Sequence, residues 1–335
     1  MNVLPRIDTE TTRAASGNPV QQAPVPAARR RIIWHYVIPF VGYHLAAALA
    51  FVPWFFSWTG VVLAVLGYFL IGALGISFCY HRLLTHRAFA CPKWLERSVA
   101  ILAVCCAQDT PVRWVATHRW HHEHADEELD VHSPAASFFW GHMGWLLIQN
   151  PNRHLMYDNY AKDLIRDPFY AAFENNLLYV WINLLSWLVF FGGGFAAELA
   201  LGGTSSQATQ FGFSCLVWGV FVRTVVQWHA TWAVNSVTHR FGYRNYETDE
   251  GSRNHLILGY FANGEGWHNN HHADPRSARF GHRWWELDTT YAVIRLLEML
   301  GLATRVALPA PGLSAARAEH TRLATRAAQE PEKTL

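Results

Sequence analysis

Four long apolar stretches constrain this chain of 335 residues more than any other feature of its sequence. They cover about 33–56, 61–80, 177–195 and 211–234. Each is long enough to cross about 30 Å of hydrocarbon. Because a backbone inside lipid finds no water to bond with, each stretch is predicted to be a helix. The sequence therefore predicts an all-α membrane protein with four transmembrane helices.

The composition agrees with a membrane protein and excludes several other classes. Charged residues make up only 16% of the chain, against about 25% in soluble domains. The 16 tryptophans are typical of membrane interfaces. A net charge of +2 is too small for a nucleic-acid-binding protein. The five cysteines form no CxxC pair, which favours small apolar fillers over a disulfide framework or a zinc site.

The two ends of the chain, 1–31 and 304–335, show no apolar period and are predicted to be flexible tails around a membrane domain of 32–303. No cleavable signal pattern begins at Met1. The segment 92–108 is apolar but marginal in length for a span. It is predicted to lie at the interface or against the part of the protein outside the membrane.

The basic residues predict the orientation in the membrane. No Lys or Arg occurs in 57–60 or 196–210, the two short connections between paired spans. Because Lys and Arg accumulate on the cytoplasmic side, both termini are predicted to be cytoplasmic in a multi-pass protein of the inner or plasma membrane. A cytosolic helical cap is then expected to consist of 81–176 and 235–303.

Three histidine clusters follow apolar segments on the predicted cytosolic side. They read HRLLTH from His81, HRWHH from His118 and HNNHH from His268. In the second and third, histidines at i, i+3 and i+4 share one helical face. In the first, a spacing of five residues separates the rings by about 140° on an ideal helix. Both rings reach one site only if that helix distorts, so it is predicted to fray near Leu83.

A fourth element, NSVTH, runs from Asn235 to His239 at the end of the last span. The combined set is nine imidazoles and one amide, too many for a single metal, since a structural zinc site has four ligands. It suits two metals with open positions for a small molecule, and a histidine-rich open site suits oxygen chemistry at iron. Metal-bound imidazoles usually donate their other N–H to a partner, and the candidates for that role are Asp126, Asp130 and His132.

These motifs resemble those of the integral-membrane fatty acyl desaturases, of the stearoyl-CoA desaturase and bacterial or cyanobacterial Δ9 type. The match extends over roughly 33–300 and includes HRLLTH, HRWHH, NSVTH and GEGWHNNHH in order. The resemblance implies four transmembrane helices under a cytosolic helical cap that holds a di-iron site. It also implies ligand sets for two Fe²⁺ ions: His81, His86, His118, His122 and His272 for one, and His121, His239, His268 and His271, with Asn235 through a water, for the other.

The resemblance further implies a kinked hydrophobic tunnel for the acyl chain. The positions that shape the kink correspond to Gln108, Trp114, Thr231 and Trp232. The positions near the closed end correspond to Phe69 and Ala73. The implied reaction is the O₂-dependent introduction of a cis double bond, at Δ9, into a saturated acyl chain. No haem-binding His-Pro-Gly-Gly motif and no paired CxxC is present, so the electrons are expected from an external ferredoxin, rubredoxin or cytochrome b5-like donor.

Two departures leave the acyl carrier open between CoA and a membrane lipid. Acyl-CoA members carry basic residues after the GWLL motif, where this chain has Gln149 and Asn150. They also carry an Arg-Asp pair before the second cluster, where this chain has Ala116 and Thr117. Phosphate groups are usually bound by Arg or Lys, so the absence of these residues weakens the case for CoA.

Three other functions are compatible with parts of the sequence. A membrane hydroxylase or alkane monooxygenase would use similar histidine clusters and put oxygen into the product. A membrane electron carrier would hold a bis-histidine haem between spans, with His35, His44 and His229 as the candidate ligands. A divalent-metal transporter would place its ligands near the bilayer midplane, whereas these clusters lie at or beyond the ends of the spans.

Overall fold

The computed structural model describes residues 31–149, 153–175 and 177–313. Within those ranges the protein is helical, and extended segments meet only in isolated bridges such as Ile32 with Ile148. Of the predicted tails, 1–30 and 314–335 lie outside the described residues, as does Asn150, whereas 304–313 are described and begin by bonding to Ala88 and Ala90. The prediction of an all-α protein is confirmed for the part of the chain that the structure describes.

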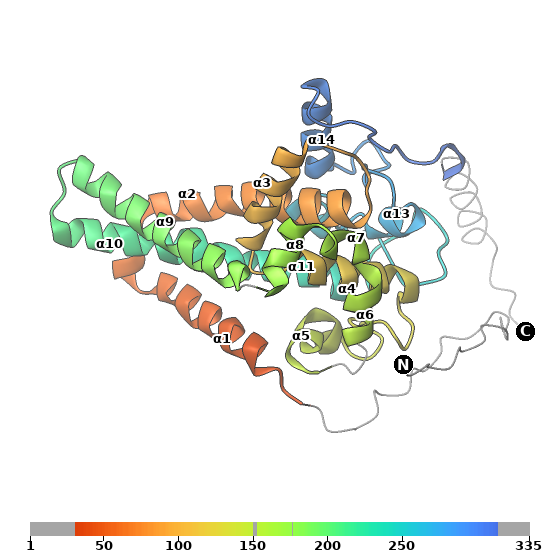
Figure 1. Cartoon of the computed structure of the whole chain (residues 1–335), viewed down its shortest axis with the longest axis horizontal. Helices are drawn as coiled ribbons and strands as arrows, with labels where there is room; N and C mark the ends of the chain where they lie inside the picture. The colour runs from red at the N-terminus through yellow and green to blue at the C-terminus, as the bar shows by residue number, and fades with distance from the viewer. Residues whose placement is uncertain (1–30, 150–152, 176, 314–335) are drawn as a thin grey trace, which may run out of the picture.

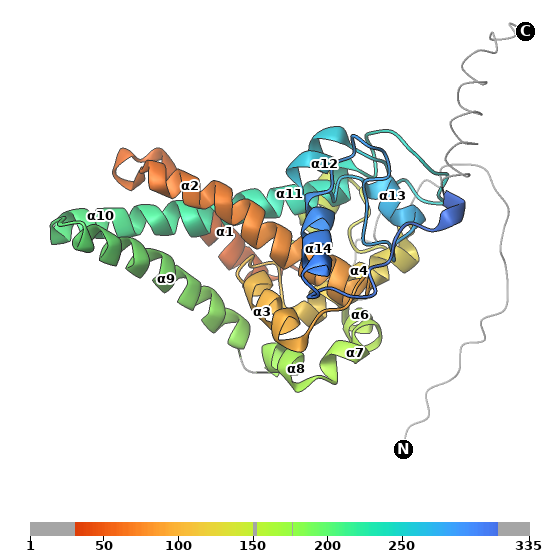
Figure 2. The same ribbon diagram turned by 90° about the horizontal axis from the view of Figure 1, so that it is seen from above.

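Three continuous helices are long and apolar enough to cross a membrane: Trp58–Thr85, Leu178–Ala200 and Ser205–Val237. The first consists of α2 (Trp58–Gly67) and η3 (Tyr68–Thr85). The second is α9. The third joins α10 (Ser205–Leu216), η5 (Val217–Val222) and α11 (Arg223–Val237). These helices extend together to one side of the molecule in Figures 1 and 2.

The first apolar stretch forms a shorter helix than the expected range of 33–56. Helix α1 spans Trp34–Ala48, 15 residues, which is about 22 Å at 1.5 Å per residue. Two short 3₁₀ turns follow, Leu49–Phe51 and Pro53–Phe55. Val52, the residue before Pro53, is extended with ψ 121°, as the residue before a proline usually is, so the helical winding stops there.

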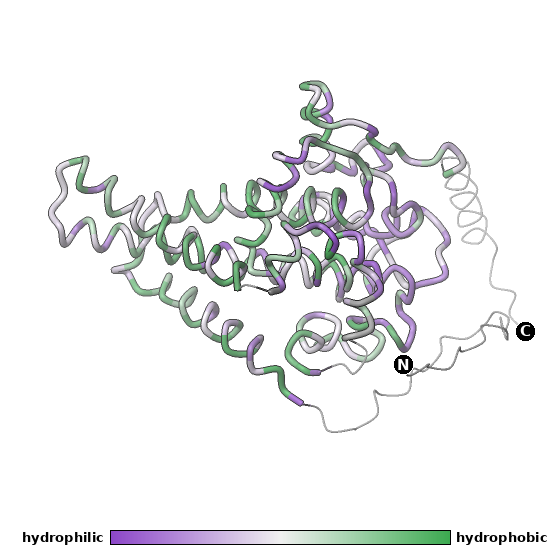
Figure 3. Tube along the Cα trace, in the orientation of Figure 1, coloured by the Kyte–Doolittle hydropathy of each residue, from purple (hydrophilic) through white to green (hydrophobic). Residues whose placement is uncertain are grey.

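Short helices form a second, more polar part of the molecule (Figure 3). Helix α3, within the segment 92–108, has 12 residues and buries one face, including Ala100 and Ala103, against η3. The remaining short helices are α4 (Pro111–His124), η4 (Trp140–Gly144), α5 (Trp145–Leu147), α6 (Arg153–Tyr160), α7 (Lys162–Ile165), α8 (Pro168–Asn175), α12 (Leu256–Phe261), α13 (His268–Ala273) and α14 (Thr289–Met299).

The end of η3 does not fray near Leu83, so that prediction was wrong. Leu83 is buried, and the helix continues to Thr85 with π-type winding. The backbone N–H of His86 donates to the carbonyl of His81 at 3.1 Å, an i to i+5 bond. Because a π-helix bonds residues five apart, the rings of His81 and His86 lie on one face without a break. Wider winding, and not unwinding, brings the pair together.

Candidate metal centre

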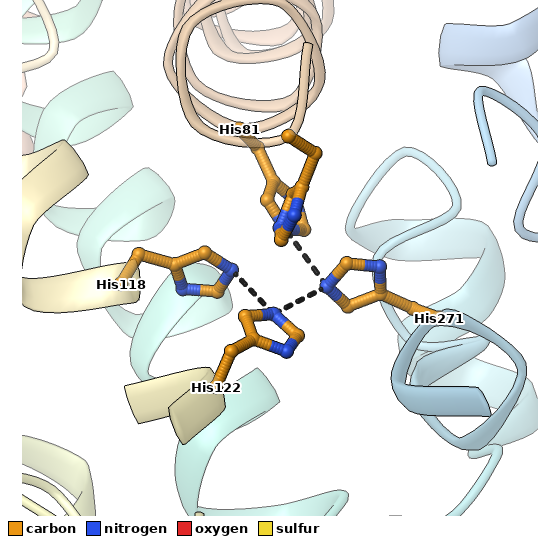
Figure 4. A group of neighbouring side chains, drawn as sticks. His81, His118, His122 and His271 are labelled. Carbon is orange, nitrogen blue, oxygen red and sulfur yellow. Dashed lines mark hydrogen bonds between the residues drawn. The ribbon is translucent and has the colours of Figure 1, made fainter. Parts of the chain in front are cut away.

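The nine histidines of the four motifs gather into two groups where η3, α4, α11 and α13 meet. The ligand nitrogens within each group all lie within 4.8 Å of one another. Figure 4 shows four members of the larger group, with rings from three different helices directed toward a common point. Segments more than 180 residues apart in the sequence therefore supply one site, as the contact of His81 with His271 illustrates.

The five-histidine group consists of His81, His86, His118, His122 and His271. Its rings meet through their Nε2 atoms. The Nε2 of His271 lies 3.0 Å from that of His81 and 2.8 Å from that of His122. The Nε2 atoms of His118 and His122 are 3.1 Å apart. Such convergence of nitrogen atoms is what several ligands of one ion would show.

The four-histidine group consists of His121, His239, His268 and His272. The Nε2 of His268 lies 3.1 Å from that of His239 and 3.0 Å from that of His272. The two groups adjoin, because the rings of His122 and His272 stack with centroids 4.5 Å apart. The structure therefore corrects the expected division in one respect, since His271 and His272 exchange places between the groups.

The exchange follows from the pitch of the two short helices. On α4, His118 and His122 are four residues apart and belong to the five-histidine group, whereas His121 belongs to the four-histidine group. On α13, His268 and His272 are four apart and serve the four-histidine group, while His271 serves the five-histidine group. At about 100° per residue, i+4 lies about 40° to one side of i and i+3 about 60° to the other, so the rings at i+3 and i+4 point about 100° apart. Each helix thus contributes to both groups in a reciprocal pattern.

Carboxylates bind the outer nitrogens of four of these rings. The Nδ1 of His121 donates to Asp130 at 3.0 Å, and the Nδ1 of His239 donates to Asp126 at 2.9 Å. Both carboxylates were expected in this role. Two further partners were not predicted from the sequence: Glu265, which accepts from the Nδ1 of His81, and Glu250, whose oxygen lies 3.5 Å from the Nδ1 of His272. A carboxylate on Nδ1 fixes the ring with a bare Nε2 toward the group.

Six of the nine rings have a lowered pKa, which favours the neutral form that ligates a metal. Burial lowers the pKa of His118, His122 and His271 well below its usual value, and neighbouring imidazoles lower it further. The pKa of His239 is raised, because its hydrogen bond and ion pair with Asp126 outweigh the cost of burial. Burial next to other imidazoles lowers the pKa of His132 to about 3.

Two buried ring nitrogens without a described hydrogen-bond partner show whether these residues fit a bound metal. The Nε2 atoms of His86 and His121 are buried and have no hydrogen-bond partner among the described residues. Leaving a buried polar atom unsatisfied costs about 1–3 kcal/mol. Each of the two nitrogens belongs to a different group, so one ion per group would satisfy both. The donor set of each group fits a metal ion, and imidazole is a ligand of iron as well as of zinc, copper and nickel.

Three of the residues predicted to shape the tunnel contact one another or a histidine of the site. The Nε2 of Gln108 donates to Thr231 Oγ1 at 3.0 Å, and Trp114 stacks on His118 with centroids 5.0 Å apart. Trp232 is buried on α11. Of the two residues expected near the closed end, Ala73 is buried, but Phe69 is 42% exposed on the outside of η3.

The remaining predicted residues lie near the four-histidine group. Asn235 is half-buried on α11, four residues before His239. His132 is buried, with its Nδ1 3.6 Å from Asp130. Asn269 and Asn270, between the histidines of HNNHH, had no predicted role, yet both are fully buried. Asn270 donates to Glu286 at 2.8 Å and to the Phe280 carbonyl at 2.7 Å, which anchors α13 from behind.

Two of the three residues named for the haem alternative, His44 and His229, contact each other directly. His44 lies on α1 and His229 on α11, and their Nε2 atoms lie 3.1 Å apart, which is a hydrogen-bond distance. His142 continues the contact, with its Nε2 3.0 Å from His229 Nδ1. Two axial ligands on opposite sides of a haem iron need more room than a direct hydrogen bond leaves.

Comparison with known proteins identifies the family. Residues 56–305 match the family model for fatty acid desaturases. The chain is 40% identical over 282 residues to an sn-1 stearoyl-lipid 9-desaturase of Anabaena variabilis, covering 84% of this chain and 96% of the relative. It is 38% identical to an sn-2 palmitoyl-lipid 9-desaturase of Nostoc sp. (strain 36), covering 86% and 95%. An acyl-CoA 5-desaturase of Anemone leveillei is 36% identical, covering 91% and 92%. This chain therefore belongs to the fatty acid desaturase family.

Proposed function

We propose that this acyl desaturase holds two Fe²⁺ ions and uses O₂ to introduce a cis Δ9 double bond into a saturated acyl chain on a membrane lipid. The observation that carries the proposal is the convergence of nine buried histidines into two adjoining groups. Bound iron would supply the oxygen chemistry that removes hydrogen from two neighbouring methylene carbons. Electrons would come from a separate ferredoxin, rubredoxin or cytochrome b5-like protein.

In this proposal the chain's own residues hold and orient the reacting parts. The five-histidine group binds one ion and the four-histidine group the other, with Asn235 acting through a water. Asp126, Asp130, Glu250 and Glu265 keep the bare Nε2 atoms directed inward. Gln108, Trp114, Thr231 and Trp232 would guide the acyl chain past the ions, since a fixed path decides which carbons react.

The lipid carrier is favoured by the names of the relatives and by the uncharged residues of this chain at three positions. The cyanobacterial relatives with 38% and 40% identity are named for lipid-linked substrates. Ala116 and Thr117 are buried on α4, and neither offers the charge that a CoA phosphate requires. Gln149 is exposed and uncharged. An acyl-CoA substrate is the second candidate, because a relative named for acyl-CoA covers a similar share of the chain.

The membrane topology belongs to the same proposal. Helix α1 with the turns that follow it would serve as the fourth membrane element beside the three long helices. Both termini and the metal centre would face the cytoplasm, in line with the distribution of Lys and Arg. The electron donor would then approach the centre from the cytosolic side.

A bacterial host that expresses the chain provides the test. We expect a new cis-monoenoic fatty acid with its double bond at Δ9, located by mass spectrometry. The variant His271→Ala removes one member of the five-histidine group and should abolish the product. The variant His124→Ala lies on the same helix, α4, outside both groups, and should retain it.

Other products would support a different reaction or a different acyl carrier. Hydroxylated chains in place of the monoene would support the monooxygenase alternative. Membranes supplied with stearoyl-lipid or with stearoyl-CoA then separate the carriers, and conversion of the CoA ester alone would contradict the lipid assignment. Loss of product in His124→Ala, with the protein present in the membrane, would show that the loss in His271→Ala is not specific to the metal centre.

A further inference from the structure

The turn that joins α3 to α4, residues 105–110, is held in an unusual backbone conformation. Ala107 and Asp109 both have left-handed φ angles, 51° and 75°. Residues other than glycine adopt such angles at a cost of about 1 kcal/mol or more. A strained conformation of this kind persists only where contacts with the rest of the protein stabilise it. The hydrogen bonds to the turn therefore identify the residues that stabilise it.

Side chains from three of the long helices satisfy carbonyl groups along this turn. Irregular backbone among membrane helices is tolerated only when the protein itself bonds it. The carbonyl of Val104, at the end of α3, accepts from Asn183 Nδ2 on α9 at 3.1 Å. The carbonyl of Cys105 accepts from Arg223 Nη2 on α11 at 3.0 Å, and that of Asp109 from the hydroxyl of Tyr80 on η3 at 3.3 Å.

Trp228 on α11 occupies the centre of this arrangement. Its Nε1 lies 2.9 Å from the carbonyl of Cys106 and 3.1 Å from that of Ala107. One indole N–H therefore holds two successive carbonyls at the strained position. The ring is buried and stacks on Trp232 with centroids 5.6 Å apart, so the donor itself is well fixed.

The turn positions two residues of the predicted acyl path, Gln108 and Trp114, of which Trp114 contacts the metal centre. Gln108 lies within it and donates to Thr231 Oγ1 at 3.0 Å. Helix α4 begins directly after it at Pro111 and carries Trp114, which stacks on His118. A displacement of the turn would therefore move Gln108 and the start of α4 together relative to the histidines outside α4, such as His81 on η3 and His271 on α13.

We propose that Trp228 is a positioning residue that sets which carbons of the acyl chain are desaturated, because it fixes the α3–α4 turn. The proposal rests on the proposed function, in which the chain passes Gln108, Trp114 and Thr231. Trp228 has no contact with the nine histidines among the described interactions. It acts through the turn, on the path that the acyl chain follows.

The variant Trp228→Phe tests the proposal, because it keeps an aromatic ring in the stack and removes the N–H. We expect the share of products with the double bond displaced by one carbon to rise about tenfold, the change in population that corresponds to one lost hydrogen bond of ordinary strength. The matched control is Trp187→Phe, which removes an indole donor to Tyr43 at 3.3 Å in the same helical bundle. Its product should keep the wild-type position.

A second readout needs no turnover. Cys106 is buried, and its Sγ lies 3.5 Å from the carbonyl of Ile71. If Trp228 fixes the turn, Trp228→Phe should speed labelling of Cys106 by a membrane-permeant maleimide, as measured by peptide mass spectrometry. Asn183→Leu, which frees the Val104 carbonyl and leaves Trp228 intact, should change labelling in the same direction.

The outcomes separate this proposal from the assignment of the reaction. Unchanged product positions and unchanged Cys106 labelling in Trp228→Phe would overturn it, as would a fall in rate without any positional change. If the wild-type protein proves to hydroxylate its substrate, the oxygenated carbon reports the same positional shift. The labelling result stands whichever product is formed.

Discussion

At the scale of single residues, the histidines were predictable and their carboxylate partners only in part. Nine imidazoles at spacings of three, four and five residues are visible in the sequence itself. Asp126 and Asp130 could be proposed because they follow the second cluster closely. Glu265 and Glu250 pair with rings that are 184 and 22 residues away in the chain. Only the folded arrangement shows which acid meets which ring, although Glu265 stands inside the GEGWHNNHH motif.

Glu265 gives a prediction about metal affinity. It accepts from His81 and lies 3.3 Å from Arg82, which is fully buried and also pairs with Asp288 at 2.9 Å. Glu265→Gln keeps the size of the side chain but removes its charge. We expect iron affinity to fall about tenfold or more, the usual effect of losing an outer partner of a ligand. Chelator competition, followed by iron analysis of the purified protein, measures it.

The matched control for that experiment is Glu247→Gln. The side chain of Glu247 is 73% exposed beside Arg244, and its substitution should leave iron binding unchanged. Equal iron retention by the two variants would contradict the role assigned to Glu265.

At the scale of elements, hydropathy predicted where helices occur but not how they wind or meet. The spacing of His81 and His86 required a distortion, and that inference was sound. The form of the distortion was wrong, since π-winding replaces fraying. The exchange of His271 and His272 has a similar origin, because it depends on the rotation of α13 about its axis, which a sequence pattern leaves undefined. The chain also packs η3 closely against α3, which apolar content alone does not reveal.

This close packing predicts a difference between two glycines in helices. A Cβ at Gly75 on η3 would lie 2.8 Å from the Cα of Ala103 on α3 and 3.1 Å from Cys106 Sγ, whereas a Cβ at Gly42 on α1 would meet nothing within 4 Å. Gly75→Ala should destabilise the protein by about 1–3 kcal/mol through overpacking. Gly42→Ala should leave stability unchanged or raise it, because alanine favours helix more than glycine. Thermal unfolding in detergent compares the two, and equal Tm values would refute the close contact.

At the scale of the whole molecule, the long apolar helices extend together to one side, and the more polar segments gather on the other side (Figures 1 and 3). The distribution of Lys and Arg predicts that the polar part faces the cytoplasm, and this orientation stays a prediction. The length of α1 was not predictable from hydropathy, since the apolar stretch continues through Pro53 while the helix ends at Ala48. Hydropathy indicates which residues are compatible with the lipid interior, whereas the length of a helix also depends on which backbone hydrogen bonds can form.

The proposed topology predicts opposite accessibility for two engineered cysteines. Ser205, at the start of α10, is exposed at the far end of the long helices, and Asp249 is exposed near His239 and Glu250. In intact cells, an impermeant maleimide should label Ser205→Cys and not Asp249→Cys, provided that Cys91 and Cys105 are replaced by serine. Labelling of Asp249→Cys in intact cells would reverse the orientation.

The reciprocal use of α4 and α13 has a consequence for how the centre is assembled. Neither helix can rotate or slide to improve one cluster of rings without displacing a ring from the other. The positions of the two clusters are therefore coupled, and an ion bound in one cluster would order both short helices for an ion in the other. Stepwise addition of Fe²⁺ to the metal-free protein should show cooperative loading, with half-filled molecules scarce at every stage. Independent occupation of the two positions, resolved by native mass spectrometry, would mean that the helices adjust separately.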